Sequence, residues 1–439
     1  MTDTAGRGHD ELAGATARWV VVLFALGVVL QRFAVPTTDV ALLIPVVLLW
    51  CGHGVRKGLL TVDRGRTALW LAAFGATALT ILAQARFVPG STASITSWGL
   101  FLVVWAPFVL RVVDARSSTY LLMLRGVARV GLWLAVGCVA MTGSQLLGQR
   151  YTDWFADVVP PALQLPGFVI TYPVAYGSEL YRANAWIGLE PSFVSAQLGL
   201  ALLAGAYTGL SAARLSLLLL ALACTVSGSG FALMAVGLLV VLAHPLRAVF
   251  VRYLPLVGVT LVAAASTDVG TVLLERVTEF QSSGSSTSLR AIEPYSYLWP
   301  VWVEDSRNVL LGLGPGSAQD LVSGTRILGL LVPSPAKVFF EYGLLAGAVL
   351  AAFLLACYVG GPSRGFSLSL LLSLWLIQPG TTTLLAVLPL MVFVTLWSPR
   401  PGLVVELQPA LLSRRARSSP RPGRPYSSRP PGALAGGRT

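Results

Sequence analysis

The sequence predicts an all-α, polytopic membrane protein, and three observations support that fold class. Of the 439 residues, 55% are hydrophobic and only 11% are charged, and the mean hydropathy is +0.73. A soluble protein of this size needs more charge to cover its surface. Apolar segments of about 20 residues, the length that crosses a bilayer, recur along the chain. The basic residues fall mostly in alternate loops, as the positive-inside rule expects.

Twelve apolar segments can be placed as membrane spans, so both ends of the chain are expected on one side. Several are short, and the two that flank residues 227–230 (SGSG) are expected to be half-helices that meet at a break. Such a break is tolerated where protein or water covers the freed backbone groups. The predicted spans are 19–33, 40–52, 67–84, 94–110, 127–147, 191–210, 214–227, 229–243, 254–272, 336–358, 365–378 and 382–398.

The arginines and lysines orient this bundle with both termini in the cytoplasm, in the inner or plasma membrane of a cell. Of the 31 basic residues, 22 then fall inside. The net charge of +12 lies largely on the inner loops and the tail, which argues against nucleic acid as a partner. The nine outer basic residues are Arg32, Arg86, Arg150, Arg182, Arg276, Arg290, Arg307, Arg326 and Lys337.

The chain divides into a cytoplasmic N-terminal segment (1–18), a transmembrane domain (19–398) and a C-terminal tail (399–439). No cleavage site follows the first apolar run, so we expect a retained helix rather than a signal peptide. The tail, rich in Pro, Arg, Ser and Gly, cannot bury enough apolar surface to fold and is expected to be disordered. The four cysteines lie in or beside apolar segments, form no CxxC pair and are expected in the core: Cys51, Cys138, Cys224 and Cys357.

Two outer loops, 148–190 and 271–337, are long, and long ordered loops often carry function. The first is aromatic and rich in proline. The second runs from a flexible stretch (QSSGSSTS) through an aromatic stretch (YSYLWPVWVEDSR) to a glycine turn (GLGPGS). There is no P-loop or Rossmann glycine pattern, and the orientation puts all three histidines inside. The sequence therefore predicts no cofactor, and no metal site in the outer loops.

Arginines in the two outer loops are the first candidates for binding an anionic substrate. The fixed fork of donors on arginine matches phosphate oxygens, and arginine does not deprotonate. Arg182, Arg290 and Arg307 could therefore hold a diphosphate. The spacing leaves a second possibility open, in which they pair with nearby loop carboxylates and only stiffen the loops.

Four segments, in this order, resemble the O-antigen ligase/polymerase superfamily of bacterial membrane glycosyltransferases. RANAWIGLEPSFVSAQLGLALL is similar to its arginine-to-EPSFFA-to-helix segment. SGSGFALMAVGLL is similar to its SRSG step, with Gly228 where an arginine is usual. SLRAIEPYSYLWPVWVEDSRNVLLGLGPGS and KVFFEYGLLAGAVLAAFLL resemble the end of its large outer loop and the helix that follows. The resemblance covers about residues 180–355 and implies a GT-C-like bundle with two long extracytoplasmic loops.

The resemblance implies a metal-independent enzyme that polymerises oligosaccharide units carried on undecaprenyl diphosphate. The product would be a cell-surface polysaccharide, such as O-antigen or exopolysaccharide. The family's functional arginines in the two outer loops correspond to Arg182 and Arg290. Positive charge is needed where the lipid diphosphate departs, and a base must accept the proton of the attacking hydroxyl. Implied partners are the lipid-linked oligosaccharide, the bilayer and other polysaccharide export or assembly proteins.

Glu190 is the first candidate for that base, or for positioning the acceptor, followed by Glu293 and Glu341. Glu190 could equally be only the N-cap of the helix that starts at Pro191. Arg307 is expected to assist at the diphosphate. The aromatic candidates could stack on sugar faces or simply anchor the protein at the membrane interface: Trp186, Tyr295, Trp299 and Trp302.

Three alternatives to a polymerase fit the sequence less well. A ligase of the same superfamily typically uses a histidine in the large outer loop, and this chain has none there. A major-facilitator transporter would carry G-x-x-x-D-R-x-G-R, but in residues 58–67 (GLLTVDRGRT) the spacing fails twice. A flippase for lipid-linked sugars would need charges lining the bundle, and the predicted spans are almost free of them.

Overall fold

A computed structural model describes residues 3–91, 93–174, 177–242, 288–325, 330–372 and 383–398, with single positions 258 and 327. The predicted span 254–272, most of the QSSGSSTS run and the tail lie outside these ranges.

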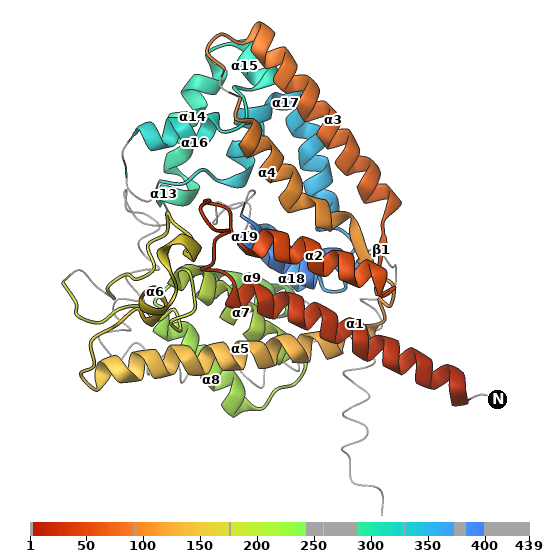
Figure 1. Ribbon diagram of the computed structural model, residues 1–439, viewed down its shortest axis with the longest axis vertical. Helices are drawn as coiled ribbons and strands as arrows, with labels where there is room; N and C mark the ends of the chain where they lie inside the picture. Colours follow the sequence, from red (N-terminus) through yellow and green to blue (C-terminus); the bar gives the residue numbers. More distant parts are fainter. Residues whose placement is uncertain are drawn as a thin grey trace, which may run out of the picture.

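The described chain is mostly helical, as Figure 1 shows. The first elements are α1 (Asp3–Val29), α2 (Leu43–Arg56), β1 (Leu60–Val62), α3 (Arg64–Phe87), α4 (Ile95–Trp105), η1 (Ala106–Val109), β2 (Leu110–Val112), α5 (Ser117–Leu146), α6 (Trp154–Val158) and η2 (Pro161–Leu163). The later elements are α7 (Pro191–Tyr207), α8 (Ala212–Cys224), α9 (Gly228–Leu242), α13 (Ser288–Ala291), α14 (Glu293–Val303), α15 (Ser306–Leu311), α16 (Ser317–Gly324), α17 (Ser334–Ala356), α18 (Arg364–Leu372), α19 (Leu384–Phe393) and η5 (Thr395–Trp397).

Every predicted apolar segment except 254–272 coincides with a helix in its described part. Among the described residues, four helices are long and apolar enough to cross a membrane: Asp10–Val29 within α1, and α3, α5 and α17. Six further apolar helices have 10–17 residues. The helical fold is thus confirmed and the apolar helices indicate a membrane protein, whereas a count of about twelve spans stays a prediction.

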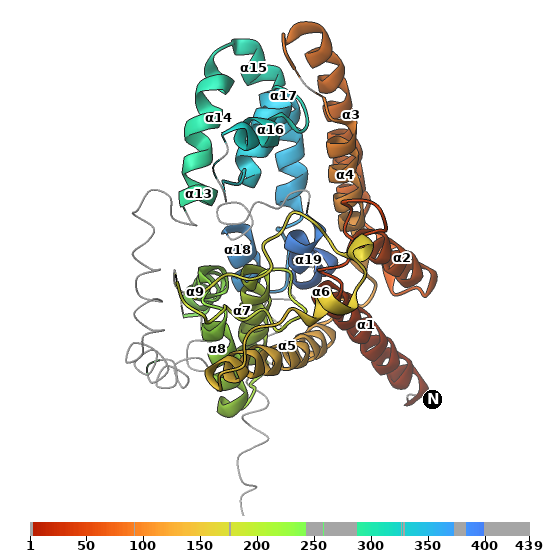
Figure 2. The same cartoon turned by 60° about the vertical axis from the view of Figure 1, so that its left-hand side comes forward.

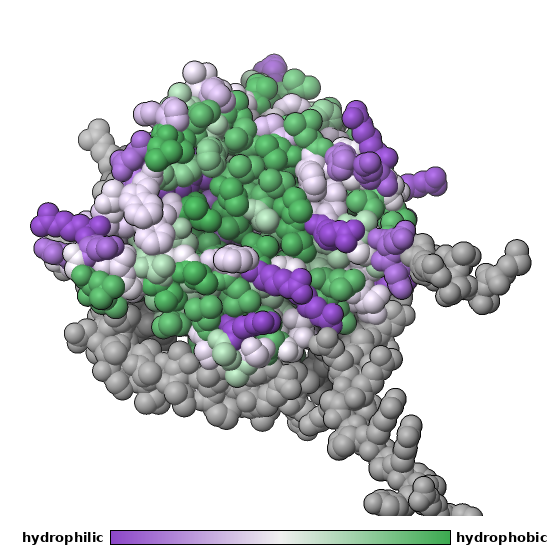
Figure 3. Space-filling model, turned by 60° about the horizontal axis from the view of Figure 1, so that its bottom comes forward, coloured by the Kyte–Doolittle hydropathy of each residue, from purple (hydrophilic) through white to green (hydrophobic). Residues whose placement is uncertain are grey.

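Large apolar side chains lie exposed on the outside of the helices, which a bilayer would cover. Leu49 on α2 is 75% exposed, Leu79 on α3 is 69% exposed and Trp133 on α5 is 79% exposed. Figure 3 shows hydrophobic residues over much of one face, with hydrophilic residues at its sides and across part of its lower half. Continuous apolar surface on this scale is unusual for a soluble protein and marks contact with lipid or another apolar partner.

Contacts between loops join helix ends that the sequence predicts on the same side. On the predicted inner side, β1 pairs antiparallel with β2, and Arg66 donates to the carbonyl oxygens of Phe108, Thr395 and Ser398. On the predicted outer side, the backbone N–H of Ser94 donates to Pro315 at 2.9 Å. Figure 1 shows α6 and α13–α16 toward the left and top, away from β1 and the N-terminus.

Two features of the predicted inner side differ from the expectation. The β1–β2 pair was not predicted, because three residues are too few for an alternating pattern to show. Helices α1 and α5 begin earlier than the predicted spans, at Asp3 and Ser117. The reason is that a stable spanning helix propagates easily into neighbouring residues with good helix propensity.

The described end of the second long outer loop is a group of four short helices, α13–α16. They share a small core of Leu298, Ala318, Val322, Leu330, Val332, Ala336 and Phe340. The predicted glycine turn lies between α15 and α16, where Gly312, Gly314 and Gly316 all have positive φ. Gly312 packs directly on the backbone at Gly343, which also has a positive φ and kinks α17. Only glycine fits this close approach without strain.

Helices α7 and α9 cross with their backbones in contact. A Cβ at Gly199 would lie 2.6 Å from the carbonyl oxygen of Gly230, and a Cβ at Gly230 would overlap the carbonyl of Ser195. The hydroxyl of Ser195 also donates to the carbonyl of Ser227 and accepts from the N–H of Gly230, both at 3.0 Å. The break between α8 and α9 is therefore covered by protein, as predicted, and small residues permit the close crossing.

This crossing gives a stability prediction. Gly230→Ala should destabilise the protein by about 1–3 kcal/mol, because the new methyl group must displace backbone. Gly228→Ala is the matched control, since a Cβ at Gly228 meets nothing within 4 Å. The midpoint of thermal unfolding in detergent checks this. Equal unfolding midpoints for the two variants would show that close backbone contact at Gly230 does not stabilise the protein.

Candidate functional site

One buried cation ties the first long outer loop to the end of α1. Arg32 is 1% exposed and donates to both carboxylate oxygens of Asp153, at 2.7 and 2.6 Å. It also donates to the carbonyl oxygen of Trp186 at 2.9 Å. Its guanidinium lies 4.1 Å from the centre of the Phe155 ring. Because Asp153 and Trp186 lie near opposite ends of the loop, Arg32 fixes where that loop closes.

A left-handed turn separates Arg182 from Glu190. Ala185 and Trp186 have φ values of 57° and 59°, and the side chain of Asn184 stabilises this turn. Its Oδ1 accepts from the N–H of Trp186 at 3.0 Å, and its Nδ2 donates to the carbonyl of Ile170 at 3.0 Å. Asparagine suits this place, since its side chain bonds to the backbone two residues on.

Arg182 lies against Tyr172, from an earlier part of the same loop. The N–H of Arg182 donates to the carbonyl of Tyr172 at 2.9 Å, and Nε donates to the carbonyl of Pro173 at 3.1 Å. The guanidinium carbon is 5.7 Å from the centre of the Tyr172 ring, within range of a cation–π interaction. These contacts fix the direction of the arginine.

Glu190 and Arg290 come close enough to Tyr172 for their charges to act on it. Burial raises the pKa of the Tyr172 hydroxyl, and the Glu190 carboxylate raises it further, whereas Arg290 and Arg182 lower it. Arg290 also acts directly on Glu190. Arg182, Glu190 and Arg290, the three residues predicted to be catalytic, therefore all lie within electrostatic range of Tyr172, although Arg290 follows Glu190 by 100 positions in the sequence.

Glu190 occupies the N-cap position of α7 by its backbone, with Pro191 as the first helical residue. Its side chain makes no capping hydrogen bond to the helix backbone and instead accepts from the hydroxyl of Ser192 at 3.1 Å. Burial is the largest influence and raises the pKa of the Glu190 carboxyl above its ordinary 4.5, against the charge of Arg290 and the hydroxyl of Ser192. Glu190 is therefore the N-cap of α7 by the position of its backbone, but its carboxylate does not cap the helix.

Arg290 belongs to α13, and two contacts hold the start of this short helix. The hydroxyl of Ser288 donates to Glu293 at 2.9 Å, so this candidate base helps to join α13 to α14. The N–H of Leu331 donates to the carbonyl of Leu289 at 3.2 Å, which fastens α13 to the chain just before α17. Leu289 itself packs against the small core of the outer helices.

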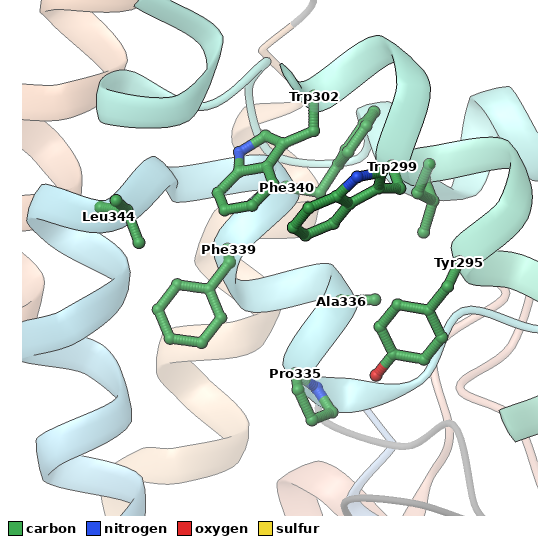
Figure 4. A pocket seen from close by; sticks show the side chains of 9 residues that line it. Tyr295, Trp299, Trp302, Pro335, Ala336, Phe339, Phe340 and Leu344 are labelled. Atoms are coloured by element: carbon green, nitrogen blue, oxygen red, sulfur yellow. The ribbon is translucent and has the colours of Figure 1, made fainter. Parts of the chain in front are cut away.

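Three predicted aromatic residues share one pocket of about 300 Å³ between α14 and α17. Figure 4 shows the rings of Tyr295, Trp299 and Trp302 opposite side chains from the start of α17. The fourth, Trp186, lies elsewhere and stacks on Trp154, with ring centres 5.5 Å apart. The second outer loop therefore provides an aromatic pocket, and the aromatic residues that line it follow shortly after Arg290 in the sequence.

The two remaining candidates lie apart from the cluster. Arg307 is exposed, pairs with Asp305 at 3.7 Å and donates to the carbonyl of Phe87 at 3.3 Å, at the α15 end of the molecule in Figures 1 and 2. Glu341 is fully buried in α17 and pairs with Lys337 at 2.6 Å. Its backbone carbonyl accepts from Gln84 and Gly314, so Glu341 supports the glycine turn.

The sequence interpretation missed Tyr172, Asn184 and the pair of Arg32 with Asp153. Asn184 lies inside the segment RANAWIG, and the run of small residues around it was the available signal for a turn. Nothing in the sequence singles out Tyr172 among the aromatic residues of its loop.

The chain matches no known family model, and no curated protein or solved structure is significantly similar to it. Within the described ranges, no group of three or more His, Cys, Asp or Glu side chains could hold a metal ion.

The Arg32 pair gives a second stability prediction. Arg32→Met should cost about 3–5 kcal/mol of folding free energy, because it leaves Asp153 without its cation in a largely buried place. Adding Asp153→Asn should recover part of that loss. Arg86→Met, at an exposed arginine on the same predicted side, should change the unfolding midpoint little. A midpoint for Arg32→Met equal to that of wild type would show that the pair does not anchor the loop.

Proposed function

We propose that this protein is a membrane glycosyltransferase that joins lipid-linked oligosaccharide units into a polysaccharide at the outer face of the cell membrane. The single observation that carries the proposal is the surroundings of Tyr172, whose ring Arg182 contacts and which also lies within electrostatic range of Glu190 and of Arg290 from the second predicted outer loop. The resemblance to the O-antigen ligase/polymerase superfamily implies the roles of Arg182 and Arg290, and Glu190 is the first candidate for the base that such a reaction needs. Their shared proximity to Tyr172 supports the proposal, because a diphosphate site needs cations and a base together.

In the proposed reaction, the hydroxyl oxygen of an acceptor sugar forms a bond to the anomeric carbon of the donor sugar. The bond from that carbon to the diphosphate oxygen breaks, and its electron pair leaves with the lipid diphosphate. The proton of the hydroxyl passes to Glu190. Arg182 and Arg290 offset the charge that develops on the leaving group, which is where fixed positive charge lowers the barrier most.

The surroundings of Glu190 suit a general base. A base is most effective when its pKa lies near the working pH, and burial moves the pKa of Glu190 in that direction. Tyr172 holds Arg182 in place, because its ring lies against the guanidinium and its carbonyl oxygen accepts from the backbone N–H of Arg182. The undecaprenyl carrier, the polymerase activity and the multi-pass placement with cytoplasmic termini are parts of the same proposal.

The first test is polymer length in a strain that lacks the native protein. Arg182→Ala and Arg290→Ala, at equal membrane abundance, should each lower polymer formation by about 10²-fold or more, as loss of one charge-stabilising donor typically does. Single units should accumulate on lipid outside. Arg307→Ala is the matched control and should leave long polymer, since Arg307 lies apart from the cluster.

Normal polymer from both arginine variants would overturn the proposed site. Single units that accumulate on the inner leaflet of the null strain would instead indicate a flippase.

A second test uses pH. The carboxylate of Glu190 acts as base only when deprotonated, so activity should rise with pH through a midpoint above 4.5, and Glu190→Gln should lack most activity. Because the pKa is raised on folding, protonation of Glu190 favours the folded state. Protonation of Glu190 therefore does not unfold the protein, and the expected loss of activity at low pH comes from loss of the base. Unchanged activity in Glu190→Gln would remove Glu190 from the mechanism.

A further inference from the structure

The pocket between α14 and α17 is walled by apolar and aromatic side chains. Tyr295, Trp299 and Trp302 form one wall, and Pro335, Ala336 and Phe339 form the facing wall. Figure 4 shows the Tyr295 hydroxyl at one edge, beside Pro335, while the ring faces line the interior.

Such walls suit a hydrocarbon better than a sugar. A sugar ring carries hydroxyl groups that need hydrogen-bond partners, and burying them against carbon is unfavourable. A hydrocarbon chain loses no hydrogen bonds there and gains free energy for every part removed from water. The pocket chemistry therefore differs from the sugar stacking that the sequence suggested for the same three aromatic residues.

The pocket opens to surface that lipid can reach. Leu344, which lines it, is 43% exposed, and its neighbour Leu345 is 59% exposed. Both lie on α17, one of the four helices long enough to cross a membrane. A chain in the bilayer could enter from this side without passing through water.

The short helix that carries Arg290 packs against the same core as the pocket. Leu289, next to Arg290, packs against the same small core as Leu298, Ala336 and Phe340, which also line the pocket. Arg290 in turn acts electrostatically on Glu190 and Tyr172, next to Arg182. An amphiphile whose head carries a diphosphate matches two arginines and an apolar pocket at once, whereas a phospholipid offers one phosphate charge.

We propose that the α14–α17 pocket binds the prenyl chain of the lipid-linked substrate while its diphosphate lies at Arg182 and Arg290. This inference rests on the proposed function, since it takes the substrate to be a prenyl diphosphate. It assigns Tyr295, Trp299 and Trp302 to the lipid rather than to the sugar. Ala336 then sets the depth of the pocket, because a larger side chain there would fill the space.

The test is photolabelling of the purified full-length protein in phosphatidylcholine nanodiscs. The probe is a prenyl diphosphate that carries a diazirine near the chain end and no sugar. Mass spectrometry should place the label on peptides of α14 and α17. Ala336→Phe should lower this labelling about 10-fold. Ala352→Phe, the same change at an exposed position of the same helix, should not.

A second blocking variant keeps the test valid if Ala336→Phe does not fold. Leu344→Trp narrows the pocket from its exposed side and should also reduce the label. Unlabelled geranylgeranyl diphosphate should compete with the probe, and phosphatidylglycerol should not. Equal labelling in both blocking variants would overturn the pocket assignment, and equal competition by phosphatidylglycerol would replace the prenyl chain with a phospholipid chain.

The two proposals can fail separately. Suppose that the label falls outside the pocket and that polymer is lost in Arg182→Ala and Arg290→Ala. This result would overturn the pocket assignment and leave the proposed polymerase site intact. Suppose instead that the label falls in the pocket and that both arginine variants make normal polymer. This result would support prenyl binding by the pocket and overturn the proposed polymerase site.

Discussion

Backbone contact between α7 and α9 is the constraint on which the candidate site depends. Helices in lipid gain little from burying apolar side chains against one another, so close packing of small residues decides how they cross. Gly199 and Gly230 provide that approach, and Ser195 bonds to the break before α9. Helix α7 is thereby held in the centre of the bundle, and its predicted outer end carries Glu190 to a fixed place.

The rest of the site is assembled from two loops that are anchored independently. Arg32 and Asp153 close the first loop, and Asn184 shapes the turn that sets Arg182 apart from Glu190. The short helices α13–α16 have their own small core, and Leu289 joins Arg290 to it. Because each loop has its own anchor, Arg182 and Arg290 hold their places without a bound ligand. In the proposed reaction, preorganised charge of this kind would need no rearrangement when the leaving group departs.

The sequence predicted the helical architecture well because apolar runs report burial directly. It also predicted the break at residues 227–230 and the glycine turn, since glycine and serine mark such places. It could not predict the roles of Arg32 or Glu341, because a buried charge and an exposed one look alike until their partners are known. Tyr172 was missed because its importance comes from how its own loop folds back on Arg182 and Glu190 and from Arg290 in the second loop.

The proposed function requires that Arg182, Glu190 and Arg290 form one site for transfer of a sugar from a lipid diphosphate. The most direct measurement uses purified protein in liposomes that contain the lipid-linked oligosaccharide unit, and follows glycosidic bonds and released lipid together. We expect one lipid diphosphate to be released for every new glycosidic bond, and both products to be lost together in Arg290→Ala. No bond formation by folded wild-type protein, or lipid released as a monophosphate, would contradict it.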